Sequence, residues 1–204
     1  MLSTDSHKNI VMVILAAGNS SRMNAVKQLL PWKDGTLLTN AIEVGISSMV
    51  SSIIVVLGAN SDKIKPSLKR LNVTVIENSQ WKNGLGTSLA FAVNYMEDNN
   101  IYADGVLCCL ADMPFVTVKH LHDLIAGFEL DNNSIVATSL KESVMVPALF
   151  DAFYFKDLVE LTGDSGAKEL LIKHQNNLIH IEVSSEKVLK DLDTPSDYNF
   201  YKKS

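Results

Sequence analysis

The chain has 204 residues, which suits one ordinary-to-large domain with a substantial buried core. Apolar residues make up 47% and charged residues 20%, and this composition excludes the disordered and fibrous classes. The net charge of -5 argues against a general nucleic-acid binder, because such proteins present a basic face. A small anionic ligand bound at a locally basic loop fits an acidic chain better.

The first strong pattern is an apolar run at residues 10–15 that leads directly into a loop of small residues. The run predicts a strand that is buried on both faces. Ala16, Ala17 and Gly18 then remove side-chain bulk, and Arg22 and Lys27 follow with positive charge. Such a loop lets backbone N–H groups approach an anion, at the strand end where α/β proteins bind nucleotides.

Strands and helices alternate along the rest of the chain. Besides the strand at 10–15, the pattern predicts strands at residues 52–57, 72–76, 104–110, 134–139, 144–146 and 178–183. It predicts helices at residues 36–49, 60–71, 85–96 and 117–128, two short helices within 151–175, and a last helix opened by Thr194 and Pro195. The two short helices are separated by a turn at residues 163–166.

The alternation predicts a three-layer, Rossmann-like α/β fold, with a mainly parallel sheet between helical layers. The irregular second half adds an antiparallel strand or a small flap. There is no linker or repeat, so we expect one domain at residues 10–204 after a flexible tail at residues 1–9. The tail lacks the apolar core of a signal peptide, and no apolar run approaches the length of a membrane span. We therefore expect a cytoplasmic protein.

The remaining reactive side chains have simple interpretations. Cys108 and Cys109 are adjacent on a predicted strand and point to opposite faces, so we expect two buried, unpaired thiols. His120 and His122 stand two residues apart on a predicted helix, and we expect both at the surface. Trp81 is expected mainly to pack under its own loop.

Four charged side chains are candidates for chemistry, and each has a simpler alternative. Arg22 and Lys27 could be solvated surface cations, since the loop is neither a Walker A nor a G-x-G-x-x-G motif. Asp112 follows an apolar strand at the sheet edge of the first loop and suits Mg²⁺, but a turn-forming aspartate would look similar. Asp193 could likewise only cap the helix that Pro195 opens, although that does not exclude a metal ligand.

The stretch LAAGNSSRMNAVK, residues 15–27, resembles the L-A-A-G-x-S-x-R-M-G-x-x-K signature of small-molecule nucleotidyltransferases. Four further stretches resemble the molybdenum cofactor cytidylyltransferase branch, which is related to the guanylyltransferases, in the same order. They are N-x-x-W-x-x-G-x-x-x-S at 78–88, LADMP at 110–114, LTGD-x-GAK at 161–168 and DLDTP-x-DY at 191–198. The resemblance covers nearly all of residues 10–200 and implies a nucleotide-diphospho-sugar transferase type of fold.

The resemblance also implies the site. The first loop would wrap the triphosphate of CTP or GTP, with Arg22 and Lys27 countering its charge. Asp112 and Asp193 would hold Mg²⁺ at the α-phosphate, which makes Arg22, Lys27 and Asp112 the catalytic residues. The nucleotide-binding residues would be Leu15, Ala16, Ala17, Gly18, Asn19, Ser20, Arg22, Lys27, Asn78, Gly84 and Ser88.

The implied reaction transfers CMP from CTP to the phosphate of molybdopterin and releases pyrophosphate. The implied partners are these small molecules and a molybdoenzyme or maturation protein, with no nucleic acid and no membrane. Alternatives are transfer from GTP, a sugar- or polyol-phosphate acceptor, or a nucleotide-binding maturation protein without transfer. The chain departs from the family pattern at two places. Asn24 stands where the family has glycine, and Val144–Pro147 stands where the family has a glycine and a polar or basic residue. Ala17 resembles the cytidylyl rather than the guanylyl branch.

Overall fold

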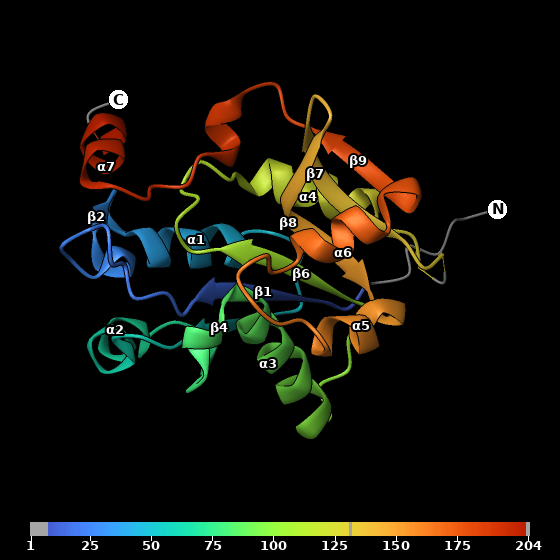
Figure 1. Cartoon of the computed structure of the whole chain (residues 1–204), viewed down its shortest axis with the longest axis horizontal. Helices are drawn as coiled ribbons and strands as arrows, with labels where there is room; N and C mark the ends of the chain where they lie inside the picture. The colour runs from blue at the N-terminus through green and yellow to red at the C-terminus, as the bar shows by residue number, and fades with distance from the viewer. Residues whose placement is uncertain (1–7, 131, 203–204) are drawn as a thin grey trace.

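The computed structural model describes residues 8–130 and 132–202, and its core is one sheet of seven strands. The order across the sheet is β5-β4-β1-β6-β8-β7-β9 (Figure 1). The strands are β1 (Ile10–Ala16), β4 (Ser52–Leu57), β5 (Thr74–Glu77), β6 (Gly105–Leu110), β7 (Ile135–Leu140), β8 (Ser143–Asp151) and β9 (Leu178–Glu182).

Most neighbouring strands are parallel, and β8 is the exception because it runs antiparallel to both β6 and β7. The mainly parallel sheet and the antiparallel strand in the second half are therefore confirmed. This strand is longer than the predicted residues 144–146, and it bends at a register shift opposite Ala137 and Thr138. The missed residues are mainly 147–151, which are buried but begin at Pro147, and a proline within an apolar run is normally taken to end a strand.

Helices cover both faces of the sheet, which confirms the three-layer α/β fold (Figure 1). One core lies between the sheet and α1, α2 and α4, and the other lies between the sheet and α3, α5 and α6. Cys108 is buried in the α3-side core and Cys109 in the α1-side core, and both thiols are free, as predicted. Burial raises the pKa of Cys108 to about 12, so its thiol is not a nucleophile near neutral pH. The helices are α1 (Leu37–Ile46), α2 (Ser61–Leu68), α3 (Leu85–Asp98), α4 (Val118–Gly127), α5 (Phe155–Val159), α6 (Lys168–Lys173) and α7 (Pro195–Lys202).

The predicted helix starts agree with the structure. The Thr36 hydroxyl accepts a hydrogen bond from the Thr39 N–H, and the Thr39 hydroxyl accepts one from the Thr36 N–H. Thr117 caps α4 by accepting from the His120 N–H. None of the helices within residues 8–130 and 132–202 is long and apolar enough to cross a membrane.

Two predictions are wrong, one about the end of a helix and one about the exposure of a side chain. The first helix ends at Ile46 instead of Met49, because the Ser47 and Ser48 N–H groups close it on the carbonyls of Glu43 and Gly45. Ile46 is therefore 52% exposed and Met49 64% exposed. His120, expected at the surface, is buried, and its Nε2 lies 2.7 Å from Thr138 Oγ1 because α4 packs against β7.

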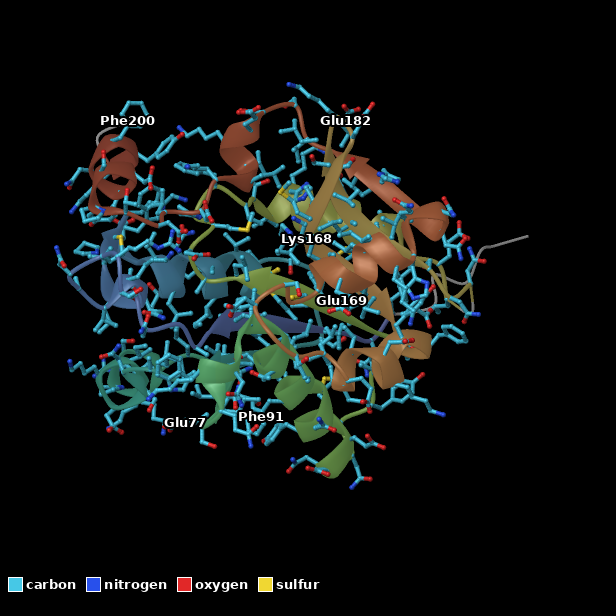
Figure 2. The ribbon with its side chains drawn as sticks, in the orientation of Figure 1. Glu77, Phe91, Lys168, Glu169, Glu182 and Phe200 are labelled. Atoms are coloured by element: carbon cyan, nitrogen blue, oxygen red, sulfur yellow. The ribbon has the colours of Figure 1, made fainter. Side chains whose placement is uncertain are left out.

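Residues near both ends of the described chain form hydrogen bonds with the rest of the domain. Of the predicted flexible tail, residues 1–7 lie outside the described part, whereas Lys8 Nζ donates to the Ile125 carbonyl and the Asn9 N–H to Asp104. At the other end, α7 lies beside the small hairpin of β2 (Pro31–Trp32) and β3 (Gly35–Thr36) (Figure 1). The Tyr198 hydroxyl donates to the Pro31 carbonyl there, while Phe200 projects outward and is 69% exposed (Figure 2).

Candidate nucleotide and metal site

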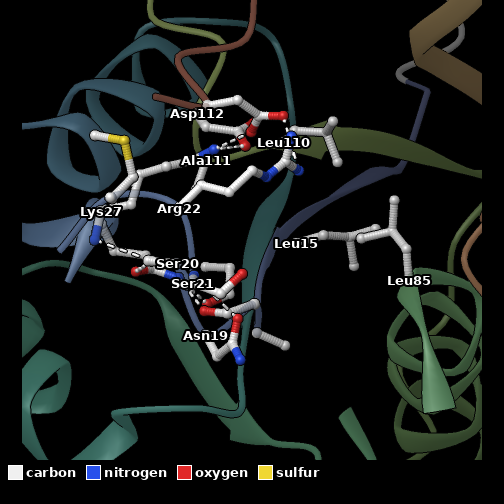
Figure 3. Close-up of a pocket in the computed structure, with 16 residues that line it drawn as sticks. Leu15, Asn19, Ser20, Ser21, Arg22, Lys27, Leu85, Leu110, Ala111 and Asp112 are labelled. Atoms are coloured by element: carbon white, nitrogen blue, oxygen red, sulfur yellow. Dashed lines mark hydrogen bonds and ion pairs between the residues drawn. The ribbon is translucent and has the colours of Figure 1, made fainter. Parts of the chain in front are cut away.

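A cavity of about 260 Å³ opens at the C-terminal ends of β1 and β6 (Figure 3). These strands are parallel neighbours in the middle of the sheet, so the loops that follow them meet at one edge. The cavity brings together ten residues of the predicted site: Leu15, Ala16, Ala17, Gly18, Asn19, Ser20, Arg22, Lys27, Asp112 and Asp193. The structure thus collects the first loop, both cations and both carboxylates in one place.

The two cations and the two carboxylates form a connected group of ion pairs. Lys27 Nζ lies 2.7 Å from Asp112 Oδ2 and 2.6 Å from Asp193 Oδ1. Arg22 Nη2 lies 3.1 Å from Asp193 Oδ2. The Lys27 side chain is only 13% exposed, whereas the Arg22 side chain is 70% exposed. Lys27 therefore lies on the buried side of the group, and Arg22 lies on its exposed side.

One backbone hydrogen bond and one cluster of side chains bring Asp193 to Asp112, although the two residues are far apart in the sequence. The Leu192 N–H donates to the Asp112 carbonyl at 3.0 Å, which fixes the two segments side by side. The Leu192 side chain is fully buried in a small cluster with Met23, Trp32 and Tyr198. Since Met23 belongs to the first loop, this cluster also joins the loop to the segment that carries Asp193.

The electrostatics of the group favour the charged forms of Lys27 and Asp193. Burial would lower the pKa of Lys27, but Asp112 and then Asp193 outweigh it, so the pKa of this ammonium lies above its usual value. Burial would raise the pKa of Asp193, yet the hydrogen bond and charge of Lys27, with Arg22, hold it below its usual value. Burial, together with the charges of Asp193 and Asp112, raises the pKa of the neighbouring Asp191.

The carboxylates present a donor set that fits a divalent cation. Asp112 and Asp193 already converge on a single positive charge, and carboxylate oxygens are the ligands that Mg²⁺ prefers. Asp112 Oδ1 is buried and has no hydrogen-bond partner among the described residues, so this carboxylate has spare capacity. Within residues 8–130 and 132–202, no group of three or more His, Cys, Asp or Glu side chains could hold a metal alone. A cation here would depend on further ligands, such as phosphate oxygens.

The first loop has room for an anion against its backbone. A Cβ atom built on Gly18 would meet nothing within 4 Å, so the space in front of this residue is open. Ser20 and Asn24 adopt positive φ angles of 57° and 52°, which shows how asparagine replaces the family's glycine at position 24. On the side of the cavity away from Lys27, Leu15 and Leu85 form an apolar wall (Figure 3).

Gln28 is a site residue that the sequence analysis missed. Its side chain is buried, and its Nε2 donates to the carbonyls of Ala16 and Gly18 at 2.8 and 3.0 Å. The Ser20 hydroxyl lies 3.2 Å from Gln28 Oε1 and also accepts from the Lys27 N–H. Gln28 thus holds two backbone carbonyls of the first loop in place. The only signal in the sequence was a polar residue within the otherwise apolar stretch that follows Lys27.

We expect Gln28→Leu to raise the KM for the nucleotide by about tenfold, because two loop carbonyls lose their donor and the loop loses its shape. Steady-state kinetics of pyrophosphate release would measure this. Asn94→Leu is a matched control, since it removes an exposed amide that donates to one helix carbonyl away from the site. An unchanged KM in Gln28→Leu would show that the loop does not need this support.

Three predicted nucleotide-binding residues do not line the cavity. Asn78 and Ser88 are buried, and the Asn78 side chain donates to Ser88 Oγ and accepts from the Gln80 N–H. Gly84 is also buried, with Leu85, its neighbour, at the cavity wall. Their direct contact with a nucleotide stays a prediction. The hydrogen bonds of Asn78 to Ser88 and Gln80 support the loop before α3.

This loop is interlocked with the turn at residues 163–166. The Gly86 N–H donates to the Gly163 carbonyl at 2.8 Å, and the Gly163 N–H donates to the Asn83 carbonyl at 3.0 Å. A Cβ atom on Gly84 would lie 2.1 Å from Gly163 C, so only glycine allows this approach. Nearby, Trp81 packs directly against the backbone of Gly58, in agreement with its predicted packing role.

An open glycine loop, two cations and two converging carboxylates at one sheet edge are typical of a site that binds an anionic ligand with a metal ion. The family model described as the MobA-like NTP transferase domain matches residues 12–178, which is most of the chain. The chain belongs to this family, and it is a nucleotidyltransferase.

Similar proteins extend over nearly the whole length. The chain is 28% identical to "Purine catabolism protein PucB" of Bacillus subtilis, covering 96% of this chain and 97% of PucB. It is 25% identical to the molybdenum cofactor cytidylyltransferase of Escherichia coli, covering 91% and 92% of the two chains. The crystal structure of Rv0371c from Mycobacterium tuberculosis superposes with a TM-score of 0.83 at 25% identity, covering 98% of this chain and all of that one. Another structure of Rv0371c is titled a complex with manganese.

Proposed function

We propose that the protein transfers CMP from CTP to the phosphate of molybdopterin and releases pyrophosphate, with Mg²⁺ as the metal. The observation that supports this most is the group of Arg22, Lys27, Asp112 and Asp193 around an open glycine loop. The similarity to a molybdenum cofactor cytidylyltransferase supports the acceptor, and Ala17 in the first loop supports cytosine. The manganese complex of Rv0371c supports a divalent cation on this fold.

Each residue has a distinct task in this proposal. The backbone at Gly18 lets the triphosphate approach the loop, while Lys27 and Arg22 neutralise its oxygens. Asp112 and Asp193 would hold Mg²⁺, which when bound withdraws charge from the α-phosphate. The apolar wall of Leu15, Leu85 and Leu110 excludes water from the other side.

The transfer itself needs no nucleophilic side chain. An oxygen of the acceptor phosphate forms the new bond to the α-phosphorus, and the bond from that phosphorus to the bridging oxygen breaks in line. Both electrons of the broken bond leave with pyrophosphate. The acceptor phosphate is already anionic, so no base has to take a proton, and catalysis consists of positioning and charge neutralisation. This agrees with the buried, protonated state of Cys108.

A second candidate is a nucleotide-binding maturation protein without transfer activity. The segment Val144–Val146 favours it, because half-buried apolar side chains stand where the family pattern has a polar or basic residue near the acceptor. The similarity to PucB, whose name gives a process instead of a reaction, is compatible with this alternative.

A pyrophosphate-release screen separates these functions. The protein is incubated with Mg²⁺, each of the four common nucleoside triphosphates, and molybdopterin or simple sugar and polyol phosphates. We expect release with CTP and molybdopterin, and at least about tenfold less with GTP. Faster release with GTP would reassign the base, and release with another acceptor would reassign the acceptor. Nucleotide binding by calorimetry without release for any pair would support the maturation protein instead.

A further inference from the structure

We propose that Lys27 competes with the divalent cation for Asp112 and Asp193, so that the site binds its metal tightly only together with the triphosphate. Free metal would then bind weakly, and the metal–triphosphate complex would bind well. This inference rests on the proposed function, because it takes Asp112 and Asp193 as the metal ligands.

The first argument is the geometry of the ammonium. Lys27 Nζ lies 2.7 Å from Asp112 Oδ2 and 2.6 Å from Asp193 Oδ1, so one cation bridges one oxygen of each carboxylate. A metal ion that takes these same two oxygens has to displace the ammonium from them. An ammonium that stayed would lie close to a doubly charged ion in a poorly solvated site, where like charges repel strongly.

The second argument is that the Lys27 side chain is largely buried and relies on the two carboxylates as its anionic partners. Its side chain is only 13% exposed, and its backbone N–H is held by Ser20 Oγ at 3.0 Å. If it left both carboxylates, a largely buried cation would have no anionic partner, which is costly. Arg22 differs, because its side chain is 70% exposed and can leave Asp193 for water at little cost.

The third argument is the balance of charge. In the ligand-free site, two cations face the two carboxylates to which they are paired. A free divalent ion would add two positive charges, which the neighbouring Asp191 carboxylate could offset only in part. A triphosphate that arrives with the metal offers Lys27 new oxygen acceptors, so the lysine exchanges carboxylates for phosphates while the carboxylates become available. Binding of the two ligands is therefore coupled.

The test is Mn²⁺ binding without nucleotide, measured from the electron paramagnetic resonance signal of free Mn²⁺. We expect Lys27→Met to bind Mn²⁺ at least about tenfold more tightly than the wild type. Lys65→Met is the matched control, since it removes a lysine from an ion pair with Glu77 outside the site, and its affinity should equal that of the wild type. Lys27→Met combined with Asp112→Asn should lose the gain. Thermal melting verifies folding, and Lys27→Gln replaces Lys27→Met if the latter does not fold.

Equal Mn²⁺ affinities for the wild type and the Lys27 variant would overturn this inference. Pyrophosphate release by the wild type with Mg²⁺ and nucleotide is measured in parallel, so the two proposals fail separately. If the wild type releases pyrophosphate while the wild type and the Lys27 variant bind Mn²⁺ equally, the role proposed for Lys27 is wrong and the proposed reaction stands. Absence of release with every nucleotide removes the proposed reaction, while the Mn²⁺ comparison still decides whether Lys27 blocks the carboxylates.

Discussion

Asp112→Ala should lower the rate of pyrophosphate release by roughly a thousandfold or more, the largest effect expected of any single substitution in this chain. Asp112 supplies one of the two carboxylates that converge at the cavity, and its Oδ1 is buried without a partner among the described residues. Without this side chain, Asp193 alone faces the metal and the developing charge at the α-phosphorus loses its support. Single-turnover kinetics with saturating nucleotide would measure the loss.

The fold should survive this change, because Asp112 lies in a loop after β6 and its side chain is part-exposed. Thermal melting of the variant should stay within a few degrees of the wild type, roughly as surface substitutions do. Asp123→Ala is the control, since Asp123 pairs with Lys119 on the exposed side of α4 and lies outside the cavity. Full activity in Asp112→Ala would eliminate the metal assignment.

Gly84→Ala should be the most destabilising small substitution, with a loss of about 3 kcal/mol in the free energy of unfolding. The new Cβ would lie 2.1 Å from Gly163 C and 2.2 Å from its carbonyl oxygen, and both are backbone atoms that cannot rotate away. The φ angle of +104° adds strain for any residue with a side chain. We expect a fall of roughly 6–12 °C in the melting temperature.

Gly163→Ala provides the comparison for this prediction. It belongs to the same contact and has a φ angle of +69°, but a Cβ there would meet nothing within 4 Å. It should therefore lose only the strain energy, about 1 kcal/mol. Equal losses of unfolding free energy in Gly84→Ala and Gly163→Ala would mean that the backbone contact between the two loops adjusts at little cost. The contact would then not fix the positions of the loops.

Much of the fold could be predicted because its signals are local. A buried parallel strand is a continuous apolar run, as at residues 10–15, and a helix start carries its own cap, as at Thr36 and Thr117. Parallel strands bring their ends to one edge, so Arg22, Lys27 and Asp112 could be expected to lie together once the alternation was recognised. The hairpin of β2 and β3 has only two residues in each strand, which is too short for any such pattern.

The rest of the site depends on contacts between distant segments, which periodicity does not encode. Asp193 reaches Asp112 through one backbone hydrogen bond from Leu192, and only the resemblance to a family indicated it. His120 looks like a surface residue until α4 packs against Thr138 of β7. Gln28 could not be recognised either, because its acceptors are backbone carbonyls, which every residue carries.

The late position of Asp193 in the chain determines when the site is completed during synthesis on the ribosome. Every strand of the sheet, through β9, precedes Asp193 in the chain. The sheet can therefore assemble during synthesis while one carboxylate of the site is still missing. Only when Leu192 and Tyr198 have emerged can the last segment fold over the first loop and complete the site. A nascent chain that has already acquired its architecture would thus still be unable to carry out the reaction proposed for the finished protein.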